Sequence, residues 1–174
     1  MATSTSDQRL VETWDVISTA FARTQRRLLA TVEAAGLPGP WFEALRLLMT
    51  AEDHRLPMSR LARDLSMTAG GLTKLADRMA RDGLIDRRNS SDDRRVVYAA
   101  LTPRGTELAS EAIELYHQGL RDHVLQVLPR AQLTELAAMM EKLRDAHSDV
   151  PAADEELTAR DPALPDRRGR GPAI

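Results

Sequence analysis

Basic residues gather in one stretch of the chain, and four of them form two adjacent pairs: Arg87, Arg88, Arg94 and Arg95. The flanking segments 84–88 and 96–101 have the composition of extended strands, and the polar segment 89–93 between them predicts a turn. Such a hairpin would bring the four guanidinium groups together as a single cationic patch. Because the arginine fork suits phosphate oxygens and narrow grooves, the patch predicts a phosphate-binding surface.

Two short helices precede this hairpin. Ser59 is the expected N-cap of the first, and Thr68 of the second, with a tight turn at 66–67 between them. The second helix is expected to end at Gly83, which suits a left-handed C′ position. Its apolar residues recur at helical spacing on one face: Leu72, Leu75, Ala76 and Met79. The opposite face is therefore free to meet a partner.

Two helices joined by a tight turn and followed by a charged hairpin predict a winged helix-turn-helix, whose second helix enters the major groove of double-stranded DNA. Its predicted DNA-binding residues are Ala69, Gly70, Gly71, Thr73, Lys74 and Arg78. The first three are small, so that the backbone can lie close to the groove. Thr73 and Lys74 are expected to reach bases or phosphates, and Arg78 a phosphate.

The distribution of charge agrees with this prediction, although the net charge does not. The whole chain carries −2, but residues 55–105 contain eleven Lys and Arg against six Asp, which gives +5 and leaves −7 elsewhere. A local basic surface is sufficient for binding phosphates, because each neutralised phosphate releases its counterions whatever charge lies on the far side of the protein. The alternative is that these are ordinary solvated helix faces.

A motif in the hairpin makes the prediction more specific. Its residues are Asp93, Arg94 and Arg95, followed by Leu101, Thr102 and Gly105. This pattern resembles the wing signature, Asp-x-Arg followed by Leu-Thr-x-x-Gly, of the multiple-antibiotic-resistance regulator (MarR) family of bacterial transcription factors. The resemblance covers about residues 7–147. It implies that Arg95 enters the minor groove, that Asp93 orients it by a salt bridge, and that Arg94 neighbours a phosphate.

The expected fold is mainly α, of the α+β class, with a winged helix-turn-helix and long terminal helices. We expect a disordered N-terminus at 1–6, a MarR-like domain at 7–147 and a disordered tail containing proline and arginine at 148–174. Within the domain, 7–36 and 103–147 are the expected dimerisation helices and 40–102 the winged lobe. The terminal helices have more apolar surface than a small lobe can cover, which predicts a two-fold homodimer rather than a monomeric bundle.

The family usually builds an effector pocket where the two tryptophans of this chain, Trp14 and Trp41, lie. Arg46 adds a cation that could meet a carboxylate or phenolate, so a small aromatic ligand is the expected effector. Each tryptophan could instead be a core residue, and Arg46 a surface arginine or an ion-pair partner.

Other chemistry is not indicated. The chain has no cysteine, so disulfides and a thiol switch are excluded. His117 and His123 are six residues apart, which is a poor spacing for a helical metal site. No nucleophile with a base and no phosphate-cradling glycine loop occurs, so we expect neither an enzyme nor a cofactor. No signal peptide or membrane span is recognisable, so a cytoplasmic protein is expected.

We therefore expect a homodimeric DNA-binding regulator, most simply a repressor that binds a palindromic operator and is released by a small aromatic or phenolic ligand. The alternative is a dimeric architectural protein that coats DNA with little sequence preference and has no effector.

Overall fold

The computed structural model describes residues 5–89 and 95–147 of the 174-residue chain. In chain order its elements are α1 (Thr5–Glu33), α2 (Gly39–Thr50), a 3-10 turn (Glu52–His54), β1 (Arg55–Pro57), α3 (Met58–Asp64), α4 (Ala69–Arg81), β2 (Ile85–Asn89), β3 (Val97–Leu101), α5 (Pro103–His123) and α6 (Arg130–Ala146). The fold is mainly helical with a small antiparallel sheet, which confirms the predicted class. Residues 1–4, the turn 90–94 and the predicted tail 148–174 lie outside the described residues.

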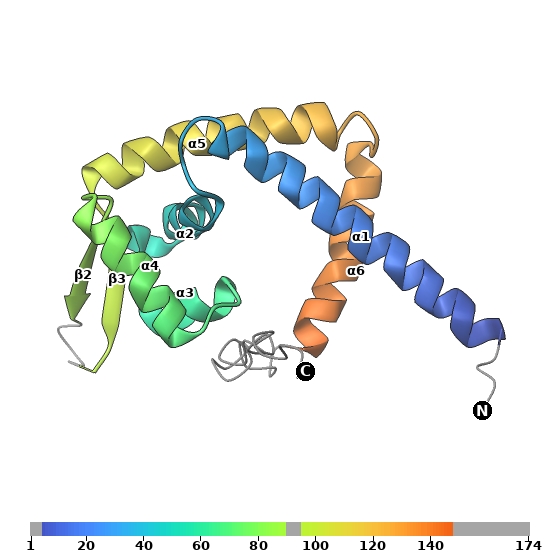
Figure 1. Cartoon of the computed structure of the whole chain (residues 1–174), viewed down its shortest axis with the longest axis horizontal. Helices are drawn as coiled ribbons and strands as arrows, with labels where there is room; N and C mark the ends of the chain where they lie inside the picture. The colour runs from blue at the N-terminus through green and yellow to red at the C-terminus, as the bar shows by residue number, and fades with distance from the viewer. Residues whose placement is uncertain (1–4, 90–94, 148–174) are drawn as a thin grey trace, which may run out of the picture.

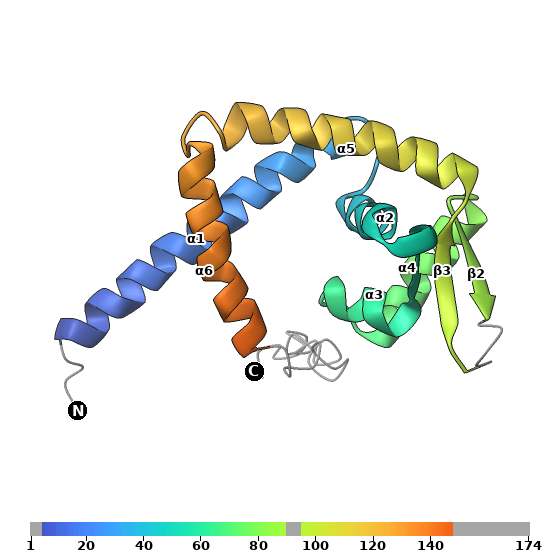
Figure 2. The same ribbon diagram turned by 180° about the vertical axis from the view of Figure 1, so that it is seen from behind.

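The chain forms a lobe and an arm (Figure 1). The lobe contains α2, α3, α4 and the sheet, and the arm contains α1 and α5, with α6 descending from the far end of α5 (Figures 1 and 2). Helix α1 starts at Thr5, two residues before the predicted start of the domain at residue 7, and α5 ends at His123, within the segment 103–147 predicted to form dimerisation helices. Pro129 is the N-cap residue of α6.

The core of the lobe is apolar throughout and surrounds the inner face of α2. Its largest fully buried side chains are Phe42, Leu45, Leu48, Leu61, Leu72 and Met79. The predicted inner face of α4 is confirmed, because Leu72, Leu75, Ala76 and Met79 are all at most 5% exposed. This packing fixes which face of α4 points outward.

The entry into α3 differs from the prediction that Ser59 caps it. The N-cap residue is Pro57, no side chain caps the helix, and Ser59 already lies in its first turn. The reason is β1, a strand that the sequence did not predict: Arg55–Pro57 pairs with Tyr98–Ala100, so the chain passes from strand to helix without a loop. The sheet order is β1-β3-β2.

The Leu-Thr-x-x-Gly motif joins the wing to α5. Thr102 is the N-cap of α5 and accepts a hydrogen bond from the backbone N–H of Gly105 (3.0 Å), while its hydroxyl donates to the carbonyl of Gly83 (2.7 Å). Gly105 is buried against Leu84, whose carbonyl oxygen would lie 1.9 Å from any Cβ at position 105. The motif therefore holds the end of α4 and the start of α5 together.

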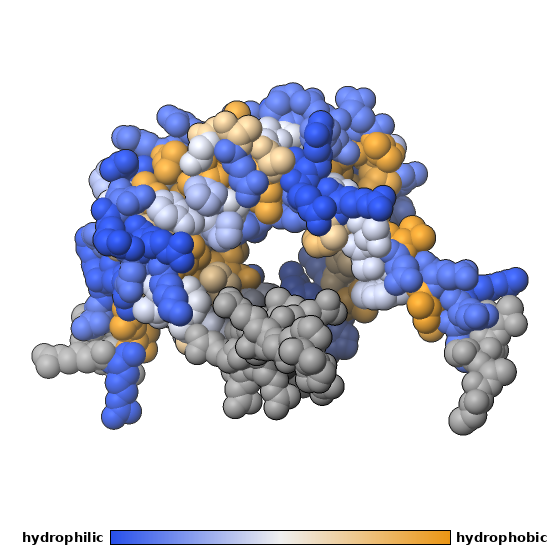
Figure 3. Space-filling view, viewed as in Figure 1, coloured by the Kyte–Doolittle hydropathy of each residue, from blue (hydrophilic) through white to orange (hydrophobic). Residues whose placement is uncertain are grey.

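The arm has large apolar side chains that its own chain leaves uncovered. Leu28 and Val32 of α1 are buried, whereas Leu10, Trp14 and Phe21 of the same helix are 70%, 53% and 69% exposed. None of the described residues of α6 is buried. Orange apolar patches along the outer part of α1 are visible in Figure 3. Over residues 5–89 and 95–147, no helix has the length and apolar character required to cross a membrane.

Candidate nucleic-acid interface

The outer face of α4 carries the predicted contact residues of the second helix. Lys74 and Arg78 are exposed and Thr73 is half-buried. The Thr73 hydroxyl donates to the carbonyl of Ala69 (2.8 Å), so its remaining capacity is as an acceptor. Arg78 donates its Nε to the Lys74 carbonyl (3.3 Å) and keeps its other N–H groups for a partner. These side chains offer two cations and one acceptor to a nucleic acid.

The start of α4 is shaped by its cap. Thr68 accepts from the backbone N–H of Gly71 (3.0 Å), as predicted. A Cβ at Gly71 would lie 3.0 Å from the Thr68 hydroxyl oxygen and 3.6 Å from the Met67 Cε. The cap therefore supplies a structural reason for this glycine that sequence reasoning did not consider. Ala69 is exposed and Gly70 half-buried in the same first turn.

The wing divides its arginines between two faces. Side chains alternate along β2, so Arg87 shares the face of buried Ile85, while Arg88 lies on the other. Arg87 forms an ion pair with Asp77 of α4, and Arg88 pairs with Asp86 (2.5 Å). The predicted single cationic patch is therefore wrong for these two arginines, because sequence proximity does not show which face of a strand a side chain occupies.

The tip of the wing holds the remaining predicted residues. Asp93 and Arg94 lie outside the described residues, so their predicted roles stay predictions. Arg95 is exposed, two residues before β3.

The three predicted ligand-binding residues are not gathered within one chain. Trp41 and Arg46 lie on α2, and Trp41 packs against the core of the lobe, which fits the core alternative. Trp14 lies in the N-terminal half of α1, which extends away from α2 (Figures 1 and 2). Arg46 forms an ion pair with Glu43 (2.7 Å), one of the alternatives left open by the sequence.

Polar contacts around Glu43 connect the lobe to the arm. Gln25 of α1 donates to Glu43 (2.7 Å), and Tyr116 of α5 donates its hydroxyl hydrogen to Gln25 (3.3 Å). Burial, and secondarily the Glu43 carboxylate, raise the pKa of Tyr116, so the phenol remains a donor at neutral pH. The Tyr116 ring packs on Phe42 with 5.0 Å between centroids. This junction relates the orientation of α2 to that of α1 and α5.

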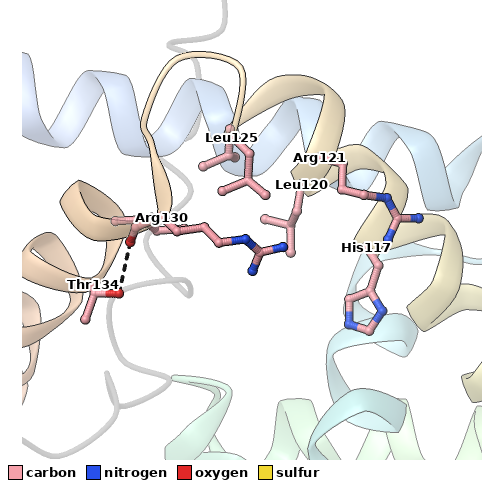
Figure 4. A pocket seen from close by; sticks show the side chains of 8 residues that line it. His117, Leu120, Arg121, Leu125, Arg130 and Thr134 are labelled. Carbon is pink, nitrogen blue, oxygen red and sulfur yellow. Dashed lines mark hydrogen bonds between the residues drawn. The ribbon is translucent and has the colours of Figure 1, made fainter.

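A groove of about 310 Å³ lies between the end of α5 and the start of α6 (Figure 4). Leu120, Val124 and Leu133 form apolar walls, and His117, Arg121 and Arg130 line it with basic side chains. His117 also pairs with Glu114 (3.6 Å). The described residues contain no group of three side chains suited to hold a metal ion.

The arrangement of α3, α4, β2 and β3 defines a winged helix-turn-helix, with the outer face of α4 beside the wing. Comparison with known proteins gives the family. Residues 35–96 match the model described as "MarR family". The transcriptional repressor YetL of Bacillus subtilis is 31% identical over 115 residues, which cover 66% of this chain and 59% of that repressor. The chain belongs to the MarR family.

Solved structures share the fold. The MarR family regulator Sco3205 from Streptomyces coelicolor, crystallised in complex with DNA, is 24% identical with a TM-score of 0.72, covering 87% of this chain and 93% of that chain. The organohalide-sensing regulator RdhR-CbdbA1625, in its 2,4-dichlorophenol bound form, is 19% identical with a TM-score of 0.63, covering 84% and 86%. This chain spans less than two thirds of the length of YetL.

Proposed function

We propose that the protein is a DNA-binding transcriptional regulator that acts as a homodimeric repressor at a palindromic operator. The observation that carries this proposal is the outer face of α4, where Lys74 and Arg78 are exposed beside the wing while the opposite face is fixed in the core. The proposal is supported by the relative YetL, which is a transcriptional repressor, and by the Sco3205 regulator, which was crystallised in complex with DNA.

The uncovered apolar side chains of α1 and α6 support the dimer. Exposed large apolar residues on two elements that their own chain leaves uncovered mark an interaction surface. A two-fold dimer would place two copies of α4 about 34 Å apart, near one turn of DNA, so the operator should be an imperfect palindrome.

Selection of bound sequences from random duplex DNA tests the proposal. The expected product is an inverted repeat with half-sites about one helical turn apart. Recovery of sequences with no common motif would contradict it and favour the architectural alternative, in which the protein coats DNA with little sequence preference.

Lys74 provides the most direct test of α4. Lys74→Ala should weaken operator binding by roughly 10-fold or more, because a charged contact to base or phosphate is lost. The control is Lys142→Ala, the same change at the only other lysine, which is exposed on α6. Equal affinities of the two variants, measured by fluorescence anisotropy with the dimer intact, would show that α4 does not lie in the groove.

The wing provides a test in which net charge and geometry predict opposite changes in the operator affinity of one variant, Asp93→Ala. If Asp93 orients Arg95 in the minor groove, Asp93→Ala should weaken operator binding although it removes a negative charge, and Arg95→Ala should weaken it as well. Arg94→Ala, as the loss of a phosphate contact, should weaken binding to all sequences alike and reduce the slope of log affinity against log salt by about one. Tighter operator binding by Asp93→Ala in a salt series would contradict the orienting salt bridge.

The proposed effector is a small aromatic or phenolic molecule that binds between arm and lobe. The dichlorophenol complex of the RdhR-CbdbA1625 regulator supports this class of ligand, as do the contacts of Gln25, Glu43 and Tyr116 at the junction. A ligand that favours a different angle of the lobe would shift the spacing of the two α4 helices away from that of the operator.

The proposed effector can be tested because ligand binding and DNA binding must change each other's affinity by the same factor. A panel of phenols and aromatic acids should contain a compound that quenches the fluorescence of Trp14 or Trp41, and the same compound should release operator DNA. Quenching without release would show a ligand that is not an effector. No response of either signal to any compound would contradict the proposed pocket and favour the core role of Trp41.

A further inference from the structure

The ion pair between Asp77 and Arg87 connects the two parts of the lobe that are proposed to enter adjacent grooves. Asp77 lies on α4 and Arg87 on β2, ten residues apart in the chain. Arg87 stands opposite Ala99 of β3, whose methyl group is fully buried, so no bulky neighbour prevents the guanidinium from reaching α4. The pair spans the space between helix and wing.

Asp77 occupies an unusual place for a carboxylate. It lies four residues after Thr73 and three after Lys74, and side chains at these spacings share one face of a helix. Its side chain is half exposed, and no cation of α4 itself forms an ion pair with it among the described residues. A carboxylate on this face repels phosphates. Its benefit to DNA binding must therefore come from the geometry that it imposes.

We propose that Asp77 is a positioning residue that makes DNA binding selective: it holds Arg87 against α4 and so sets the angle between the recognition helix and the wing. This inference rests on the proposed function. The guanidinium has five N–H donors in a fixed fork, and the Asp77 carboxylate uses only part of this capacity. The remaining donors are then held in one orientation toward a phosphate between the two grooves.

The same pair limits binding to DNA without an operator. With Asp77 present, the charge of Arg87 is balanced, so flexible contacts with any phosphate are weakened. Without Asp77, Arg87 becomes a mobile cation that can follow any duplex. Specific and non-specific affinity should therefore change in opposite directions.

Asp77→Asn tests this inference against a matched control, Asp86→Asn. Both changes remove one negative charge close to the wing, and the two side chains are similarly exposed, at 51% and 47%. Asp86, however, pairs with Arg88 of the same strand, and by the alternation of side chains along β2 it lies on the opposite face from Arg87. Charge alone predicts the same result for both variants.

Affinities for a selected operator and for random duplex would be measured by fluorescence anisotropy over a salt series. For Asp77→Asn, we expect tighter binding of random duplex, weaker binding of the operator, and a ratio of operator to random affinity that falls roughly 10-fold. For Asp86→Asn, the ratio should stay close to that of the unchanged protein. Asp77→Glu, which restores the charge on a longer side chain, should recover part of the ratio.

A second background separates positioning from a general loss of structure. In Arg87→Gln protein, Asp77→Asn should no longer change the ratio, because the residue through which Asp77 acts is absent. Equal ratios for Asp77→Asn and Asp86→Asn, or a full effect of Asp77→Asn without Arg87, would overturn the inference. If the unchanged protein binds operator and random duplex with equal affinity, the proposed function itself fails. The affinities of the unchanged protein alone show this outcome, so it is distinguishable from a failure of the inference.

Discussion

In the proposed homodimer, Phe21→Asp is expected to abolish association and leave a monomer at micromolar concentration. Phe21 is 69% exposed in the isolated chain, and a two-fold interface would bury two copies of it. Each buried phenylalanine contributes about 1.5–3 kcal/mol, so losing two weakens association by roughly 10²–10⁴-fold before the desolvation of two aspartates is added. Sedimentation equilibrium measures the association, and operator binding should be lost with it, because one half-site contact is insufficient.

Thr19→Asp is the control for this change. At 100° per residue, Thr19 lies roughly 200° around α1 from Phe21, so it carries the same new charge on the opposite side of the helix. The Thr19→Asp variant should remain dimeric. If Phe21→Asp also remains dimeric, the exposed face of α1 has another role and the proposed assembly must be replaced.

Gly105→Ala is expected to produce the largest loss of stability of any alanine substitution in the wing motif. The new Cβ would lie 1.9 Å from the carbonyl oxygen of Leu84, a backbone atom that can move only if the sheet or α5 moves. Overpacking of a core usually costs about 1–3 kcal/mol, and a clash with backbone belongs at the upper end or beyond. The Thr102 cap, which bonds both Gly83 and Gly105, should be distorted at the same time.

Gly119→Ala, in the same helix, separates this clash from the general effect of replacing glycine. There the nearest atoms are side-chain ends, Leu28 Cδ2 at 3.3 Å and Thr31 Oγ1 at 3.5 Å, which can move aside. Alanine also favours a helix over glycine by about 1 kcal/mol. Urea denaturation should therefore show a large loss for Gly105→Ala and a change within about 1 kcal/mol for Gly119→Ala. Similar midpoints would mean that Leu84 accommodates the methyl group.

The lobe could be predicted from the sequence because its signals are local. Thr68 and Thr102 are side-chain caps that bond N–H groups three residues away, and the apolar spacing of α4 places its own inner face. Each of these interactions lies within one or two turns of helix, so residue order alone specifies it. The strand β1 was not predicted because three residues ending in proline show no alternation of apolar and polar side chains. The N-cap assigned to Ser59 was wrong for the same reason, since β1 leads directly into α3.

The candidate site was only partly predictable, because its charges are arranged by packing between elements. The sequence alone determined that basic residues gather in the winged lobe and that α4 presents Thr73, Lys74 and Arg78 outward. Only the tertiary structure decided that Arg87 turns inward to Asp77 while Arg88 turns away, and that Arg46 is joined to Glu43. The reason is physical: a helix or hairpin forms from neighbours in sequence, whereas an ion pair between elements depends on the angle at which the core packs them.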